Sequence, residues 1–270
     1  MAIIPELFLR AVTSVGIRTK NDEIKWIGSG FFLLKVVDDA GNGKPFLVTN
    51  KHVVESHDSI VLMFNDENNH EVIYADAPLL DDGKNICYFH ENKIIDIAVV
   101  PLNGNFFNDN HLPFYAFNID EHTMTSKELL GSGVEEGTFI YMLGFPMELV
   151  NNNSTLPICR LGCIARIKES QIAETANYLV DLQNFPGNSG SPIITRPEII
   201  SIQGTPRLNR SVLAGIVHSY IPYREELQSR QTGLVVELRT ENSGIALVHP
   251  VEYIREIIDH ILANQDHDKA

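Results

Sequence analysis

The chain has 270 residues, of which 44% are hydrophobic, and its formal net charge is −14 at pH 7. This length and apolar content allow a sizeable core in one or two domains. The negative charge argues against nucleic acid as a partner, because attraction to phosphate needs clustered Lys and Arg.

Signals for membrane insertion, secretion and disulfide bonding are weak in this sequence. No apolar run approaches the ~20 residues of a membrane-spanning helix. The N-terminal segment from Met1 to Glu6 does not resemble a secretion signal. Three cysteines, Cys87, Cys159 and Cys163, are too few for a disulfide framework. We therefore expect a cytoplasmic protein that does not bind membranes.

Short apolar or β-branched runs, separated by turns rich in Gly, Asn and Asp, predict a chain dominated by strands. The expected strands of the first half are residues 26–37, 46–49, 59–64, 71–75 and 94–102. Residues 5–14 fit either a short helix or a first strand. Residues 103–133 are polar and less periodic, and we expect the linker between two halves there.

A second set of strands and a helix complete the chain. The expected strands are residues 138–143, 158–167, 178–182, 191–195, 212–218, 233–238 and 245–248. From Glu252 to Ala263, apolar residues recur at 254, 257, 258, 261 and 262, which is the spacing of an amphipathic helix. We expect this helix to pack on the second set of strands.

Two polar residues stand out against apolar runs in the first half. The run Phe46–Val48 ends in polar residues and then His52, and Asp96 interrupts the β-prone run Lys93–Pro101. A buried carboxylate needs a hydrogen-bonding partner. A neutral histidine that must hold one tautomer is a suitable partner for Asp96.

Ser189 lies in the turn Gly187-Asn188-Ser189-Gly190. A serine between glycines can present its hydroxyl to a substrate, and backbone N–H groups of the same turn can face the charge that develops on a substrate oxygen. Alone, this turn is a weak signal. With a histidine and an aspartate earlier in the chain, it predicts a nucleophile that a base activates.

The order His52, Asp96, Ser189 separates the known triad classes. Subtilisin has Asp first and the α/β-hydrolases have Ser first. His–Asp–Ser is the order of the chymotrypsin/trypsin-like serine proteases, and the three local segments resemble that family. Residues 49–53 resemble its T-A-A-H segment, residues 96–99 its D-I-A-L segment, and residues 187–190 its G-D/N-S-G turn.

Three flanking segments narrow the resemblance to the protease domain of bacterial high-temperature-requirement proteases. Gly28–Phe32 is similar to their G-S/T-G-F strand, and Gly144–Pro146 to their G-x-P turn. Gly244–Pro250 is similar to the strand that leads into their C-terminal helix. The likeness covers residues 10–262.

The resemblance implies an all-β fold of two six-stranded antiparallel β-barrels followed by a C-terminal α-helix. The barrels would span residues 10–125 and 130–250, and the helix residues 251–263, in a single peptidase domain of residues 1–270. The implied activity is that of a serine endopeptidase acting on a protein or peptide substrate, without a cofactor or a metal.

The resemblance also implies a role for each site residue. Ser189 is the nucleophile, His52 is the base and then the acid, and Asp96 orients His52. The oxyanion hole would consist of Gly187, Asn188 and Ser189, with the backbone N–H groups of Gly187 and Ser189 as its donors. Zymogens of the family carry Asp at the position of Asn188. No activation by a freed N-terminus is therefore implied, and loop ordering or an activating partner would take its place.

In the family, residues before the serine and a later strand line the pocket for the side chain that precedes the cleaved bond. Here these residues are Gln183, Asn184 and Phe185, with His218, Ser219 and Tyr220 opposite. Gln183 stands where trypsin-like members carry Asp, so a preference for Lys or Arg loses its electrostatic basis.

Three interpretations of His218 stay open. Strand side chains alternate between faces, so the spacing Gly215-Ile216-Val217-His218 turns the ring toward Asp96, which it would support. Ordinary packing is the second interpretation. A pocket role is the third, and it needs a β-bulge.

Plainer interpretations apply to the other residues too. His52, Asp96 and Ser189 could be an ordinary strand-end histidine, edge aspartate and turn serine, and a decayed site would leave a non-catalytic peptide-binding or regulatory module on the same fold. Cys159 and Cys163, four residues apart on a strand, are too distant for a disulfide and too few for zinc. We expect both to be packed in the interior.

Overall fold

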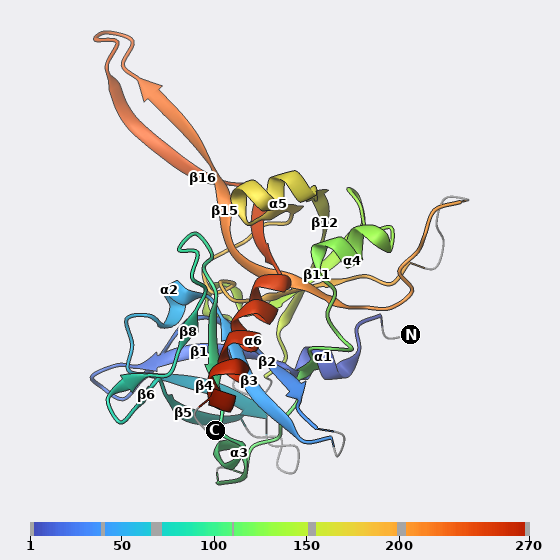
Figure 1. Ribbon diagram of the computed structural model, residues 1–270. Coiled ribbons are helices and arrows are strands. Elements are labelled where there is room, and N and C mark those ends of the chain that lie inside the picture. The colour runs from blue at the N-terminus through green and yellow to red at the C-terminus, as the bar shows by residue number, and fades with distance from the viewer. Residues whose placement is uncertain are drawn as a thin grey trace.

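A computed structural model describes residues 3–38, 41–65, 72–109, 111–150, 155–198 and 204–267. Residues 1 and 2 of the N-terminal segment and residue 71 of the expected strand 71–75 lie outside these ranges. The fold is dominated by strands in two bodies, with short helices around them and a longer helix at the C-terminal end (Figure 1). The expected fold class is confirmed.

The strands of the first half form one large sheet. They are β1 (Val12–Arg18), β2 (Ile24–Val36), β3 (Gly43–Thr49), β4 (Ser59–Asn65), β5 (Val72–Pro78), β8 (Tyr88–Phe89) and β9 (Ala98–Pro101), with a separate pair β6 (Leu80–Asp81) and β7 (Lys84–Asn85). The order is β5-β4-β1-β2-β3-β9-β8, and β10 (Phe117–Asn118) adds in parallel to β2. Among the described residues the large sheet thus includes eight strands, where the resemblance implies six in this half.

The strands of the second half close into a six-stranded barrel. They are β11 (Phe139–Gly144), β12 (Ile158–Arg166), β13 (Tyr178–Asp181), β14 (Pro192–Thr195), β15 (Leu213–Gln228) and β16 (Val235–Pro250), in the order β11-β12-β13-β16-β15-β14. Alternate residues such as Ile140 and Met142, or Tyr178 and Val180, point into a shared apolar core, as the two-residue period of a strand requires.

Several elements differ from the sequence-based expectation. Only Ala98–Pro101 of the expected strand 94–102 is paired in β9, so Asp96 lies in an irregular segment just before it. The expected strands 233–238 and 245–248 are both parts of β16. With β15, this strand forms an exposed two-stranded arm that projects from the barrel (Figure 1). An exposed arm shows no alternation of buried and exposed residues. The sequence pattern therefore predicts separate short strands in place of one long strand pair.

The helices lie before, between and after the strands. They are α1 (Glu6–Arg10), α2 (Lys51–Val54), α3 (Gly104–Asp109), α4 (Ser126–Gly131), the 3₁₀ turn η1 (Pro146–Glu148), α5 (Glu169–Thr175) and α6 (Glu252–His267). The ambiguous stretch 5–14 holds both a helix and the start of β1. The expected linker 103–133 contains α3, β10 and α4, and α5 has no counterpart among the predicted elements.

Helix α6 joins the two halves. Its apolar stripe of Ile254, Ile257, Ile258 and Ile261 is buried in a cluster that includes residues from both halves. Helix α6 packs on β16 of the second set of strands, as expected, and it also contacts β8 and β9 of the first. Each buried Ile contributes ~1.5–3 kcal/mol of apolar burial to this junction.

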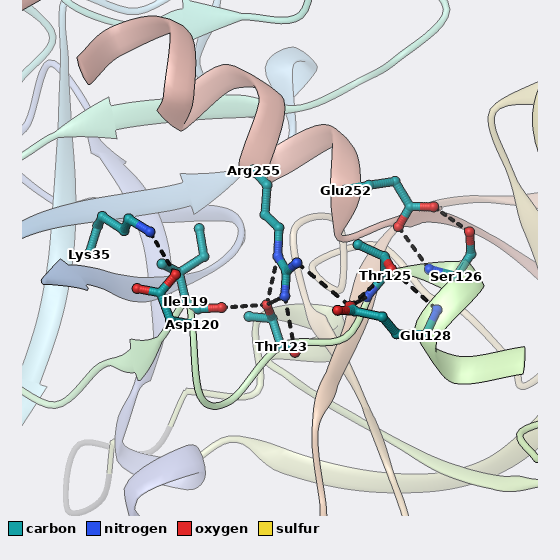
Figure 2. A network of polar contacts seen from close by, with 9 residues as sticks. All are labelled: Lys35, Ile119, Asp120, Thr123, Thr125, Ser126, Glu128, Glu252 and Arg255. Carbon is teal, nitrogen blue, oxygen red and sulfur yellow. Dashed lines mark hydrogen bonds and ion pairs between the residues drawn. The ribbon is translucent and has the colours of Figure 1, made fainter. Parts of the chain in front are cut away.

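Polar contacts attach α6 to the linker between the halves, as Figure 2 shows. The Arg255 guanidinium donates to Thr123 Oγ1 at 2.6 Å and to the Thr123 carbonyl at 3.1 Å. The Ser126 hydroxyl and backbone N–H of α4 both donate to the Glu252 carboxylate. These direct hydrogen bonds hold the linker and helix α6 together.

Candidate active site

His52 is presented at the end of a buried strand. The apolar end of β3 is buried up to Thr49, and the chain then turns at Asn50, in extended conformation, into the short helix α2. This turn brings His52 to the surface, where 47% of its side chain is exposed. The ring is therefore held by the first sheet and still accessible to a substrate.

Asp96 binds His52 through both carboxylate oxygens. The His52 backbone N–H donates to Oδ1 at 3.0 Å, and Nδ1 of the ring lies 2.5 Å from Oδ2. Only a ring that is protonated on Nδ1 can donate to this carboxylate, so in the neutral ring Nε2 carries the lone pair. The structure thus joins two of the three residues of the expected triad.

The electrostatics of Asp96 agree with this contact. Burial on its own would raise the pKa of the Asp96 carboxyl. The side-chain hydrogen bond from His52, followed by the charge of His52, its backbone N–H and the charge of His218, outweighs burial and holds that pKa below its ordinary value. The carboxylate is therefore charged at neutral pH, as a group that stabilises a protonated imidazole must be.

The Ser189 turn lies against β2, the strand that pairs with β3. The Ser29 backbone N–H of β2 donates to the Ser189 carbonyl at 2.8 Å. A Cβ atom on Gly28 would lie 3.1 Å from that carbonyl and 3.0 Å from the methyl groups of Val53, the neighbour of His52. A side chain at position 28 would meet the serine turn on one side and helix α2 on the other, so glycine suits this position.

Two backbone N–H groups of the serine turn are free to bind a negative oxygen. The Pro186 carbonyl accepts from the Met147 N–H at 2.6 Å, and the Asn188 carbonyl accepts from the Ser191 N–H at 2.9 Å. In each trans peptide the N–H points opposite to its carbonyl, so these contacts orient the N–H groups of Gly187 and Ser189. Neither donates to an acceptor among the described residues. Such a pair of donors is the arrangement that an oxyanion hole requires.

Gly187 and Asn188 have different tasks in this turn. Gly187 adopts φ +94°, a conformation that favours glycine. The Asn188 N–H donates to the Phe185 carbonyl at 3.0 Å, so Asn188 belongs to the turn of the expected oxyanion hole while its N–H is already occupied. Its amide is fully buried and has no partner among the described residues.

Ser29 supports the same turn and was not singled out by its residue type. Its hydroxyl donates to the Gly187 carbonyl at 2.7 Å and accepts from the Phe145 N–H at 3.0 Å, and the residue is fully buried. The signal in the sequence is a serine between two glycines in an otherwise apolar strand. A buried hydroxyl at such a position needs partners, but the sequence does not show which ones.

The expected pocket residues lie on two facing segments. The Asn184 amide donates to the Ser219 carbonyl at 3.2 Å, and Asn242 of β16 donates to the Asn184 carbonyl at 2.6 Å. Gln183 is exposed, and Tyr220 is half-buried. The Phe185 ring lies 5.1 Å from the Arg160 guanidinium.

The surroundings of His218 bear on each of its three interpretations. The ring stacks on His249 with centroids 4.0 Å apart, and its Nε2 lies 2.8 Å from the Asn177 side-chain oxygen. Burial first, and then the charge of His249, lower the pKa of His218 to about 3. The stack on His249 fits ordinary packing, and the charge of Asp96 acts on the ring as the supporting interpretation requires. The pairing of β15 with β16 shifts register between Val217 and Ser219, at the place where the pocket interpretation needs a bulge.

The cysteines are not arranged as expected. Cys159 on β12 is exposed, so the expectation of interior packing is wrong for it, because its side chain lies on the outer face of the barrel. Burial raises the pKa of Cys87 to about 11, which keeps that thiol protonated at neutral pH. Across the described ranges, no three His, Cys, Asp or Glu side chains gather as a metal site would need. No helix within those ranges is both long and apolar enough to cross a bilayer.

Comparisons with known proteins bear on the family. A search of curated proteins finds no match. Among solved structures, the chain is similar to the MamO protease domain from Magnetospirillum magneticum in its apo form, with 14% identity, a TM-score of 0.47, and coverage of 93% of this chain and 96% of that one. Residues 28–198, which include His52, Asp96 and Ser189, match the family model of the trypsin-like peptidase domain. That match spans more than half of the sequence, and the chain therefore belongs to the trypsin-like peptidase domain family.

Proposed function

We propose that this chain is a serine endopeptidase that hydrolyses peptide bonds through an acyl-enzyme. The observation that carries the proposal is the contact between His52 and Asp96, with the Ser189 turn held nearby at Gly28 and Ser29. The free N–H groups of Gly187 and Ser189 add the electrostatic part of such a site.

In the proposed reaction, His52 Nε2 takes the hydroxyl proton of Ser189 as Oγ attacks the peptide carbonyl. The N–H groups of Gly187 and Ser189 bind the oxyanion that forms, and Asp96 stabilises the protonated ring. His52 then gives its proton to the leaving amine, so that the C–N bond breaks and an ester to Ser189 remains. Water, deprotonated by His52, hydrolyses this ester and regenerates the serine.

The finer features of the proposal come from the sequence. The segments Gly28–Phe32, Gly144–Pro146 and Gly244–Pro250 favour a bacterial protease of the high-temperature-requirement type. Because Asn188 carries no charge, a freed N-terminus would find no ion pair there, and the uncleaved chain should be active by itself or with an activating partner. Gln183 favours substrates other than those with Lys or Arg before the cleaved bond. A cytoplasmic location remains a prediction.

Labelling by a fluorophosphonate probe tests the proposal. The probe phosphonylates a serine only where a base and an oxyanion hole activate it. We expect the folded wild-type chain to be labelled, and Ser189→Ala to abolish labelling. Ser191→Ala is the matched control, because Ser191 lies two residues away in the same turn and should leave the label on Ser189. A wild-type chain that is folded but never labelled would contradict the proposal and favour a non-catalytic peptide-binding module.

A further inference from the structure

Asp96 lies where no strand holds its backbone. It precedes β9, so no ladder supplies partners for its N–H and carbonyl. The carbonyl accepts from the Asn50 side-chain amide at 2.7 Å, and the N–H donates to Nε2 of His249 at 3.0 Å. The first sheet thus holds one side of the Asp96 backbone, and a histidine from the barrel holds the other.

The contacts of His249 determine its protonation state. A backbone N–H can only donate, so Nε2 must carry a lone pair. The Ala176 carbonyl can only accept, so Nδ1, at 2.8 Å from it, must carry the proton. His249 is fully buried at the end of β16. Only the neutral ring with its proton on Nδ1 satisfies both contacts.

The turn after α5 sets the orientation of His249 and of His218. Ala176 caps the helix in the left-handed conformation with φ +56°, which is costly for a residue with a Cβ, and directs its carbonyl at His249. Asn177 donates to the Thr175 carbonyl at 2.6 Å, so its side-chain oxygen is left to accept from His218 Nε2. The two stacked rings are therefore fixed by adjacent residues of one turn.

The groups that face His249 shift its pKa in opposite directions. They are His218 stacked on it, the Asp96 segment, Tyr253 of α6 edge-on at 6.3 Å, and His90, whose charge acts from beyond Tyr253. Burial is the largest influence and lowers the pKa of His249, and it outweighs the Ala176 carbonyl and the charge of Asp96, which raise that pKa. A second proton would place Nε2–H against the Asp96 N–H, so a protonated His249 could no longer hold that backbone.

We propose that His249 is a positioning residue of the protease site, whose neutral ring holds the Asp96 backbone so that the carboxylate can hold His52. This inference rests on the proposed function, but its structural part does not need activity. His249 and Ala176 are both buried and therefore not open to a substrate. The effect on the reaction passes from His249 to Asp96 and then to His52.

Two substitutions separate the two contacts of His249. His249→Gln can place an amide oxygen near the position of Nε2 and accept from Asp96, without the donor to Ala176. His249→Asn can place an amide near the position of Nδ1 and donate to Ala176, without reaching Asp96. A purely structural role predicts similar behaviour of both variants. A positioning role predicts that Gln retains function and Asn loses it.

The rate constant of fluorophosphonate labelling, per folded molecule by circular dichroism, is the first measurement. We expect His249→Asn to lower it by about 100-fold, the order expected for a misplaced catalytic group, and His249→Gln to retain most of it. Equal loss in both variants, or loss in neither, would overturn the inference.

Hydrogen exchange of the Asp96 amide, followed by NMR, is the second measurement and is independent of activity. We expect protection in the wild type and in His249→Gln, and fast exchange in His249→Asn. If the wild type is not labelled but this pattern appears, the proposed function fails while the contact stands. If neither variant folds, ¹⁵N shifts of the wild-type ring decide, because a His249 protonated on Nε2 is incompatible with the proposal.

Discussion

Single side chains in this site form hydrogen bonds with backbone groups that lie outside the strand ladders. Ser29 is the clearest case, because one hydroxyl bridges Phe145 and Gly187 from another body of the molecule. In the same way, Asn50 forms a hydrogen bond with the Asp96 carbonyl and His249 with the Asp96 N–H. Removing such a side chain leaves a buried donor or acceptor unpaired, which costs more than the net value of a hydrogen bond.

We therefore predict that Ser29→Ala destabilises the chain by about 1–3 kcal/mol, since the Phe145 N–H and the Gly187 carbonyl lose their partner. Labelling of Ser189 should slow as well, because the Gly187 peptide is then less constrained. Urea unfolding and the labelling rate constant measure the two effects. Ser14→Ala is the control: Ser14 is also buried, but its hydroxyl contact to Gly28 is a long 3.5 Å. Ser29→Ala without any effect beyond that of Ser14→Ala would contradict this account of the turn.

At the scale of elements, the linker and α6 hold the two halves together. Helix α4 begins at Thr125 with a capping box, in which Thr125 Oγ1 accepts from the Glu128 N–H and the Glu128 carboxylate accepts from the Thr125 N–H at 2.6 Å. This hydrogen bond from the Thr125 backbone is the main cause that lowers the pKa of Glu128. Arg255 and Glu252 then connect α6 to the same place (Figure 2).

We predict that Thr125→Ala lowers the free energy of unfolding by about 1 kcal/mol, as the loss of an N-cap does. Thr125→Ser retains the hydroxyl and should be close to wild type. Urea titration of the three chains measures the difference. Labelling of Ser189 should be unchanged in the folded state, since Thr125 touches none of the site residues. Equal stabilities of the Ala and Ser variants would show that the cap contributes nothing.

At the scale of the whole molecule, buried histidines couple stability to pH. The folded pKa of His218 is about 3, and that of an unfolded histidine is ~6.5. Above the unfolded value both states are neutral and His218 has no effect. As the pH falls below ~6.5, only the unfolded state gains the proton, so stability is lost down to about pH 3. His249 and His122 are shifted in the same direction, mainly by burial.

We predict that the free energy of unfolding falls by about 2 kcal/mol between pH 7 and pH 5 from His218 alone. Asp96, whose folded pKa is depressed, contributes stability that is lost only at lower pH, as the pH falls through that pKa. Urea unfolding at both pH values measures the loss. His218→Gln should reduce it, whereas His260→Gln, at an exposed position of α6, should not. A pH dependence that His218→Gln leaves intact would exclude His218 as its source.

Elements with a one-sided burial pattern were predictable, and elements without one were not. The stripe of α6 and the alternating strands of the barrel carry their period in the sequence. The arm of β15 and β16 is exposed on both faces, so its length could not be read from alternation. Asp96 looked like part of a strand because its neighbours are β-prone, yet the pairing with β3 begins only at Ala98.

The sequence by itself determined the chemistry of the candidate site, because the residue types and the order of His52, Asp96 and Ser189 are local and can be recognised without coordinates. It also determined the strand-rich class and the C-terminal helix. Only the tertiary structure decided which groups hold the site in place. Asp96 meets His249 across 153 positions, and Gly187 meets Ser29 across 158. The direction of a backbone N–H depends on the partner that its peptide carbonyl finds, and that partner comes from distant segments which no local pattern encodes.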